Sequence, residues 1–173
     1  MPETSALKVA RTAGGYCLRV EGRGTMRESQ SAAQFVAGPL EREGASVVID
    51  LSACDHLDST FLGCLVEMQR KAGKSLPPRL VISAPPEKVK KLLSATKLDL
   101  VLKSTAEPPQ VVGDFITLPA AEPGTPDVMR HVMECHRMLA ETGAPQKAAF
   151  AAIADSIQKE LENSGGSAGK PAR

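Results

Sequence analysis

The sequence predicts an α/β fold, in which a mixed β-sheet carries helices and a helical extension follows at the C-terminus. Two observations lead to this prediction. The chain opens with two short apolar segments separated by Gly14-Gly15, which is typical of a β-hairpin. Beyond residue 25, short apolar runs typical of strands alternate with segments of helical spacing. Such alternation predicts helices packed on a sheet.

Each expected element has a local signal. Thr25 and Glu28 form the Thr-x-x-Glu pattern of a capping box, so a helix is expected to start after Thr25. Further helices are expected at residues 58–71, from Pro85-Pro86 to about residue 97, from the segment 123–127 to residue 141, and at 146–162. The expected strands are residues 7–10, 16–21, 47–51 and 80–83, with a fifth at 98–102 or 115–118. The stretch 103–113 contains Pro108-Pro109 and predicts a loop or edge insertion, which leaves 115–118 to pair near the sheet edge.

The most informative segment is 47–65. It begins as a short apolar run, typical of a strand buried on both faces, and continues through Asp58-Ser59-Thr60 into a helix. A helix N-terminus has unpaired backbone N–H groups and the positive end of the helix dipole, so hydroxyls there are well placed to handle phosphate. Asp58 or Ser59 could equally serve as the helix N-cap alone. The local pattern leaves open whether Ser59 binds, attacks or receives a phosphoryl group.

This segment resembles the central motif of STAS domains, the family of bacterial anti-sigma-factor antagonists. The family motif commonly runs Asp-Ser-Ser/Thr-Gly-Leu-Gly at the start of the second helix. The matching residues here are Asp58, Ser59, Thr60, Leu62 and Gly63, while Phe61 stands where a Gly is usual. The resemblance implies a STAS-like mixed sheet over residues 7–143. A tail at 1–6 would precede it, and a C-terminal helix with a flexible tail would follow at 144–173.

The resemblance also implies a function. In the family, a partner kinase phosphorylates the hydroxyl residue after the Asp, which is Ser59 here. The expected partner-binding residues are Asp58, Ser59, Thr60 and Phe61. The expected partners are an anti-sigma factor or serine kinase and a phosphatase, with self-association into a homodimer as a further expectation. The domain itself would have no catalytic residue.

Two alternatives remain at the level of sequence. A STAS-like subunit of a lipid-transport ABC complex would use the same surface for binding, without phosphorylation. A small enzyme would use Ser59 or Cys54 as nucleophile. A serine hydrolase is disfavoured because glycines do not flank Ser59 and because two of the three histidines, His131 and His136, lie on a distant helical segment.

Composition and sequence pattern argue against several other classes of protein. A net charge of +1, no Trp and one Tyr give no basis for nucleic-acid binding. No apolar run approaches the roughly 20 residues that span a bilayer, and no signal peptide is visible, so we expect a cytoplasmic protein without membrane insertion. His131 and Cys135 are one helical turn apart, but a zinc site needs about four ligands and the sequence shows no second half. We therefore expect no metal and no cofactor.

Overall fold

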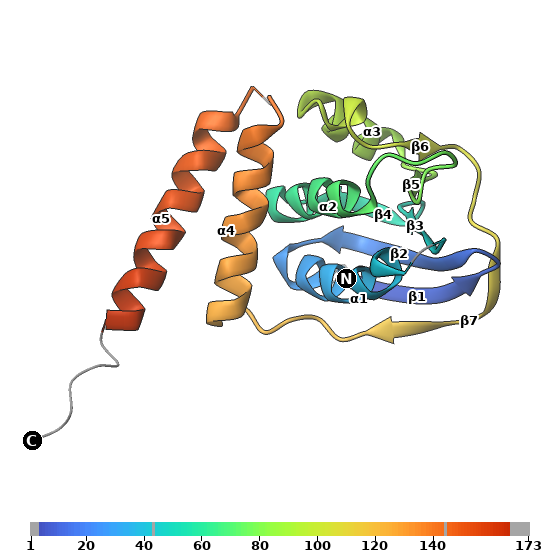
Figure 1. The fold of residues 1–173 in the computed structure, drawn as a ribbon, viewed down its shortest axis with the longest axis horizontal. Coiled ribbons are helices and arrows are strands. Elements are labelled where there is room, and N and C mark those ends of the chain that lie inside the picture. Colours follow the sequence, from blue (N-terminus) through green and yellow to red (C-terminus); the bar gives the residue numbers. More distant parts are fainter. Residues whose placement is uncertain (1–3, 43, 144, 167–173) are drawn as a thin grey trace, which may run out of the picture.

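The computed structural model describes residues 4–42, 44–143 and 145–166 and has the expected α/β architecture (Figure 1). The first half of the chain forms β1 (Ala6–Thr12), β2 (Gly15–Gly24), α1 (Met26–Glu41), β3 (Ser46–Asp50), β4 (Cys54–Leu57) and α2 (Ser59–Ala72). The second half forms β5 (Leu80–Ser83), α3 (Glu87–Ala95), the 3₁₀ turn η1 (Leu98–Leu100), β6 (Ser104–Thr105), β7 (Val111–Leu118), α4 (Pro126–Glu141) and α5 (Lys147–Gly166).

The described strands form one mixed sheet in the order β6-β5-β3-β2-β1-β7. The strands from β2 to β6 pair in parallel, whereas β1 pairs antiparallel with both β2 and β7. The predicted hairpin is β1–β2, and the short strand β4 pairs in parallel with the end of β2. Because β3 leads through β4 into α2, the start of α2 lies at the carboxyl end of the parallel strands, where open α/β sheets present functional groups.

The two alternatives for a fifth strand have different outcomes. Residues 98–102 do not form a strand: Leu98 and Leu102 are buried and Leu100 is 79% exposed. Two buried residues four positions apart, with an exposed residue midway between them, are typical of a helical turn and not of a strand. Lys97, which has a left-handed backbone conformation, precedes this turn. The edge pairing of 115–118 is confirmed, because this segment belongs to β7 beside β1.

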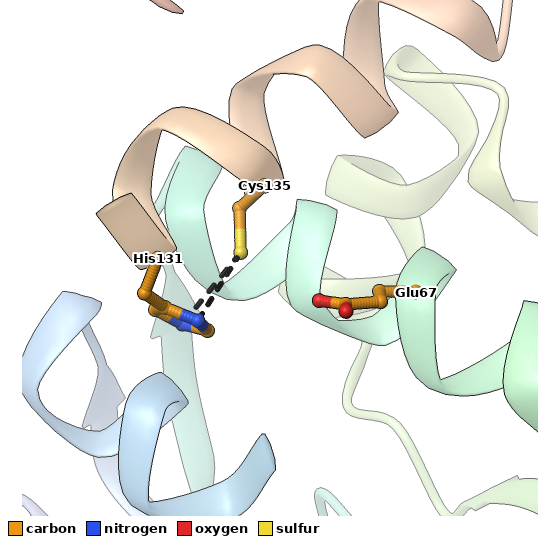
Figure 2. Close-up of side chains that lie close together, drawn as sticks. All are labelled: Glu67, His131 and Cys135. Atoms are coloured by element: carbon orange, nitrogen blue, oxygen red, sulfur yellow. Dashed lines mark hydrogen bonds between the residues drawn. The ribbon is translucent and has the colours of Figure 1, made fainter. Parts of the chain in front are cut away.

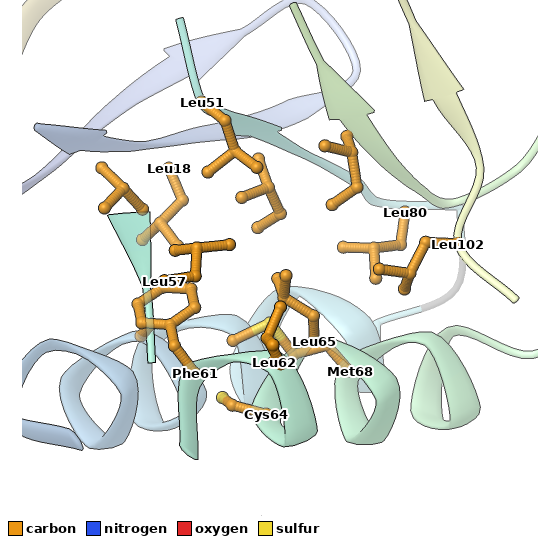
Figure 3. Packing of buried hydrophobic residues seen from close by; sticks show 14 of the residues in the cluster. Leu18, Leu51, Leu57, Phe61, Leu62, Cys64, Leu65, Met68, Leu80 and Leu102 are labelled. Carbon is orange, nitrogen blue, oxygen red and sulfur yellow. The ribbon is translucent and has the colours of Figure 1, made fainter. Parts of the chain in front are cut away.

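The core lies between the sheet and the helices α1 and α2 (Figure 3). Figure 3 shows Phe61, Leu65 and Met68 of α2 directed toward strand residues such as Leu18. The opposite side of α2 is also covered, because α4 packs against it. Burial on both sides makes α2 the central helix of the molecule, so the site at its first turn rests on a rigid element.

The C-terminal helices form an outer layer. In Figure 1, α4 crosses the end of the molecule beside α2, and α5 runs along the outside of α4. In α5, Ala154 is fully buried and Phe150 packs partly against the core, whereas Ile153 is 41% exposed. The predicted helix 146–162 is therefore present and continues to Gly166. Of the expected tails, residues 1–3 and 167–173 lie outside the described residues.

Truncation after Gly143 is expected to lower the melting temperature by only about 2–4 °C, equivalent to roughly 1 kcal/mol. The side chains of α5 bury little surface, and ordering a helix of this length offsets much of that gain. Thermal unfolding of the truncated and full-length chains checks this, with a chain ending at Gly166 as control. A fall of 10 °C or more would show that α5 is part of the folding unit.

Candidate functional site

The N-termini of two helices meet at one carboxylate, that of Asp58. Its Oδ1 accepts a hydrogen bond of 2.8 Å from the backbone N–H of Phe61, in the first turn of α2. Its Oδ2 accepts one of 2.9 Å from the N–H of Met26, the first residue of α1. Asp58 is thus the N-cap of α2 and also satisfies a donor of α1. The positive ends of both helix dipoles are directed toward this point.

The start of α1 has its own cap. Thr25 and Glu28 form the predicted capping box, in which the Thr25 side chain accepts from the N–H of Arg27 and Glu28 accepts from the N–H of Thr25 at 3.0 Å. The backbone N–H of Asp58 also donates to the carbonyl of Gly24 at 2.9 Å. These bonds fix the two helix ends relative to each other, so Ser59 has a defined position beside both.

Ser59 is the first residue of α2 and is half-buried. Its Oγ lies 2.9 Å from Nε2 of His136, a buried residue of α4. Nδ1 of His136 lies 2.7 Å from the carbonyl oxygen of Val132 and must donate to it, so Nε2 is the acceptor of the neutral ring. Ser59 therefore donates its hydroxyl proton to His136. This contact could not be predicted from local sequence patterns, because the two residues are 77 positions apart.

The other two predicted partner-binding residues face inward. Thr60 is 4% exposed, and Phe61 is fully buried with its ring against Gly24, where an added Cβ would lie 2.9 Å from the ring. Of the four predicted residues, Asp58 and Ser59 are therefore the two that can contribute exposed surface. Next to them, Asp55 and His56 of β4 are exposed.

The pairing of Ser59 with His136 resembles part of a hydrolase site, but the third group is a backbone carbonyl and not a carboxylate. Four surface cavities formed by the described residues are lined by other side chains, and Ser59 lines none of these four. The arrangement holds the hydroxyl in place.

Cys54 was the other candidate nucleophile. It is 2% exposed on β4, and burial raises the pKa of its thiol to about 11. A thiol with so high a pKa is almost fully protonated at neutral pH, whereas nucleophilic and redox-active cysteines need the thiolate. Cys54 is therefore a packing residue.

One cluster near the site carries metal-ligand chemistry. Two turns along α2, Glu67 approaches His131 and Cys135 of α4. The sequence suggested the pair on α4 but not Glu67, because nothing in the local pattern shows which face of α2 meets α4.

Among the described residues, no helix is both long and apolar enough to cross a bilayer.

Comparison with known proteins identifies the architecture. The family model described as "Mlab, STAS domain" matches residues 7–103, which is more than half of the chain. The chain belongs to the STAS domain family. No curated protein sequence matches it. The family match ends before β7, so α4, α5, His131, Cys135 and His136 lie outside it.

A solved structure has the same fold, and two others are similar in part. The unphosphorylated form of the anti-sigma factor antagonist SpoIIAA is 12% identical, with a TM-score of 0.50 over 59% of this chain and 90% of that one. A Thermotoga maritima protein described as an anti-sigma factor antagonist is 22% identical, with a TM-score of 0.49 over 56% of this chain and 82% of that one. The phosphorylated form of the Bacillus SpoIIAA is 12% identical, with a TM-score of 0.46 over 60% of this chain and 93% of that one.

Proposed function

We propose that this STAS domain is a regulatory binding protein, similar to anti-sigma factor antagonists, whose docking surface at the start of α2 is switched by phosphorylation of Ser59. The proposed partners are an anti-sigma factor or serine kinase and a phosphatase that reverses the modification. The observation that carries the proposal is the position of the Ser59 hydroxyl at the meeting point of two helix N-termini, beside a buried Thr60. We propose residues 7–143 as the functional domain, since β7 pairs with β1 and α4 packs on α2.

A phosphate fits this position without unfolding the domain. It adds about −1.5 to −2 charges and three acceptor oxygens. Negative charge at a helix N-terminus is favourable by typically 0.3–1 kcal/mol. The main effect is then on the exposed surface, where Asp55 and Asp58 already carry negative charge. A third negative group would repel an acidic partner surface. Against an apolar partner surface it would oppose binding because its charge would lose water.

Phosphorylation also changes the contact with α4. The esterified Oγ of Ser59 has no proton to donate, and the phosphate oxygens are acceptors facing the Nε2 acceptor of neutral His136. The present hydrogen bond between α2 and α4 would therefore be lost in this tautomer. The modification would thus add surface charge and remove the present hydrogen bond to α4.

A second function is favoured by one observation. The Ser59 hydroxyl is half-buried and bonded to His136, so in this conformation it is a structural group. This suits a binding module that is never phosphorylated, such as a STAS-like subunit of a lipid-transport ABC complex. In that case the surface around Asp58 and Ser59 would pack against the transporter ATPase.

Co-purification from the native cells separates the two functions. A tagged full-length chain is expected to retain an anti-sigma factor or a serine kinase, identified by mass spectrometry. Recovery of an ABC-transporter ATPase instead would support the second function. Recovery of neither class with the parent protein, under conditions that preserve a crosslinked complex, would contradict both.

A further inference from the structure

We propose that Glu67, His131 and Cys135 form a binding site for Zn²⁺ that clamps α4 onto α2. The three donor atoms lie within 4.8 Å of one another (Figure 2). Zinc bonds of 2.0–2.3 Å at tetrahedral angles separate neighbouring ligand atoms by roughly 3.3–3.8 Å. The atoms are thus at most about 1–1.5 Å beyond the required spacing, and the Glu67 side chain, part of which is exposed, can rotate to shorten it.

The helices supply the ligands in a regular pattern. His131 and Cys135 are four residues apart and therefore share one face of α4. That face meets α2 at close range, because a Cβ on Gly63 would lie only 2.1 Å from the carbonyl oxygen of Cys135. The close approach at Gly63 brings Glu67, one turn further along α2, within reach of both ligands on α4. Facing helices of bundles build metal sites in the same way.

A buried serine supports the histidine of the cluster. Nε2 of His131 lies 2.8 Å from Oγ of Ser29, which is fully buried and also lies 3.1 Å from the carbonyl oxygen of Met26. When the Ser29 hydroxyl donates to Met26, its oxygen accepts from the Nε2–H of His131. Nδ1 is then the nitrogen open to the ion, and Cys135 Sγ lies 3.9 Å from Nδ1 and 3.6 Å from Nε2. A ligating His usually donates its other N–H to an oxygen in this manner.

The chemistry of the three donors suits a transition-metal ion. The hydrogen bond with Cys64 and burial raise the pKa of the Cys135 thiol, so the thiol is protonated in the absence of metal. Binding would form the Zn–S bond and release the thiol proton to solvent. Thiolate, imidazole and carboxylate together suit Zn²⁺ better than Mg²⁺ or Ca²⁺.

The site shares no residue with the pair Ser59 and His136, so its failure would leave the proposed function intact. The test uses the reduced full-length chain, stripped with a chelator and titrated with Co²⁺. We expect one Co²⁺ per chain, with the visible bands of tetrahedral cobalt and a thiolate-to-cobalt charge-transfer band, all displaced by Zn²⁺. Absence of these bands would overturn the proposal.

Variants locate the ion. Cys135→Ser is expected to abolish the charge-transfer band, and Cys54→Ala, a second buried cysteine on β4, is expected to leave it unchanged. Because loss of Cys135 could impair folding, Glu67→Gln and Ser29→Ala provide milder tests, each with circular dichroism as a check of folding. Ser29→Ala is expected to weaken Co²⁺ binding by about 10–100-fold through loss of the support to His131. A charge-transfer band that persists in folded Cys135→Ser, or parent affinity in both milder variants, would refute the site.

Discussion

Replacing Gly63 with alanine is expected to lower the free energy of unfolding by about 3 kcal/mol, at the upper end of the cost of overpacking. The added Cβ would lie 2.1 Å from the carbonyl oxygen and 2.6 Å from the carbonyl carbon of Cys135. These are backbone atoms, so no side-chain rotation relieves the contact and α4 must move away from α2. The melting temperature should fall by roughly 6–12 °C, and α4 should exchange its amide hydrogens faster.

Gly165→Ala is the matched control for this change. Gly165 also lies in a helix, but an added Cβ there has no atom within 4 Å. Both substitutions add one methyl group to a helical glycine, and only the one at Gly63 meets α4. A Gly63→Ala protein that is as stable as the parent would show that α4 does not pack against α2 as described.

Ser59→Asp is expected to weaken binding of the native partner at least tenfold, or about 1.4 kcal/mol, while Ser59→Ala binds like the parent. The aspartate adds negative charge beside Asp55 and Asp58 and cannot donate a proton to His136. Alanine adds no charge and loses one hydrogen bond, with a net stability cost of about 0.5–1.5 kcal/mol. Binding of the co-purified partner to each variant, measured by calorimetry, checks this.

Ser94→Asp controls for charge alone, because Ser94 is exposed on α3 and belongs to neither β4 nor α2. It should bind the partner like the parent. Equal affinities of the parent, Ser59→Asp and Ser59→Ala would show that the hydroxyl has only a structural role, as the transport-subunit alternative requires.

The start of α2 was predictable because its signals are local. A short apolar run, a capping aspartate and a change to helical spacing all lie within residues 47–65, and the structure has β3 and α2 within one residue of the expected bounds. Asp58 proved to be the N-cap, one of the two roles considered for it. The strand β4 was missed because its four residues pair with β2 through a bulge, and their burial does not alternate.

The contacts around the site were not predictable because they depend on tertiary packing. His136 reaches Ser59 only because α4 crosses α2, and the glycine that permits the crossing is 72 positions before Cys135 in the chain (135 less 63). Glu67 has the appearance of a surface residue in the helical pattern. It forms an i,i+4 ion pair with Lys71 at 3.4 Å, which is common on helix surfaces, and its approach to His131 and Cys135 depends on how α4 packs.

Phosphopeptide mapping of the protein from its native cells tests the central claim most directly. After separation on a phosphate-affinity gel, the retarded band is expected to carry phosphate on Ser59. Thr60, which is 4% exposed, should remain unmodified, and Ser59→Ala should remove the retarded band. A retarded band that persists in Ser59→Ala, or phosphate found on Thr60 alone, would contradict the account.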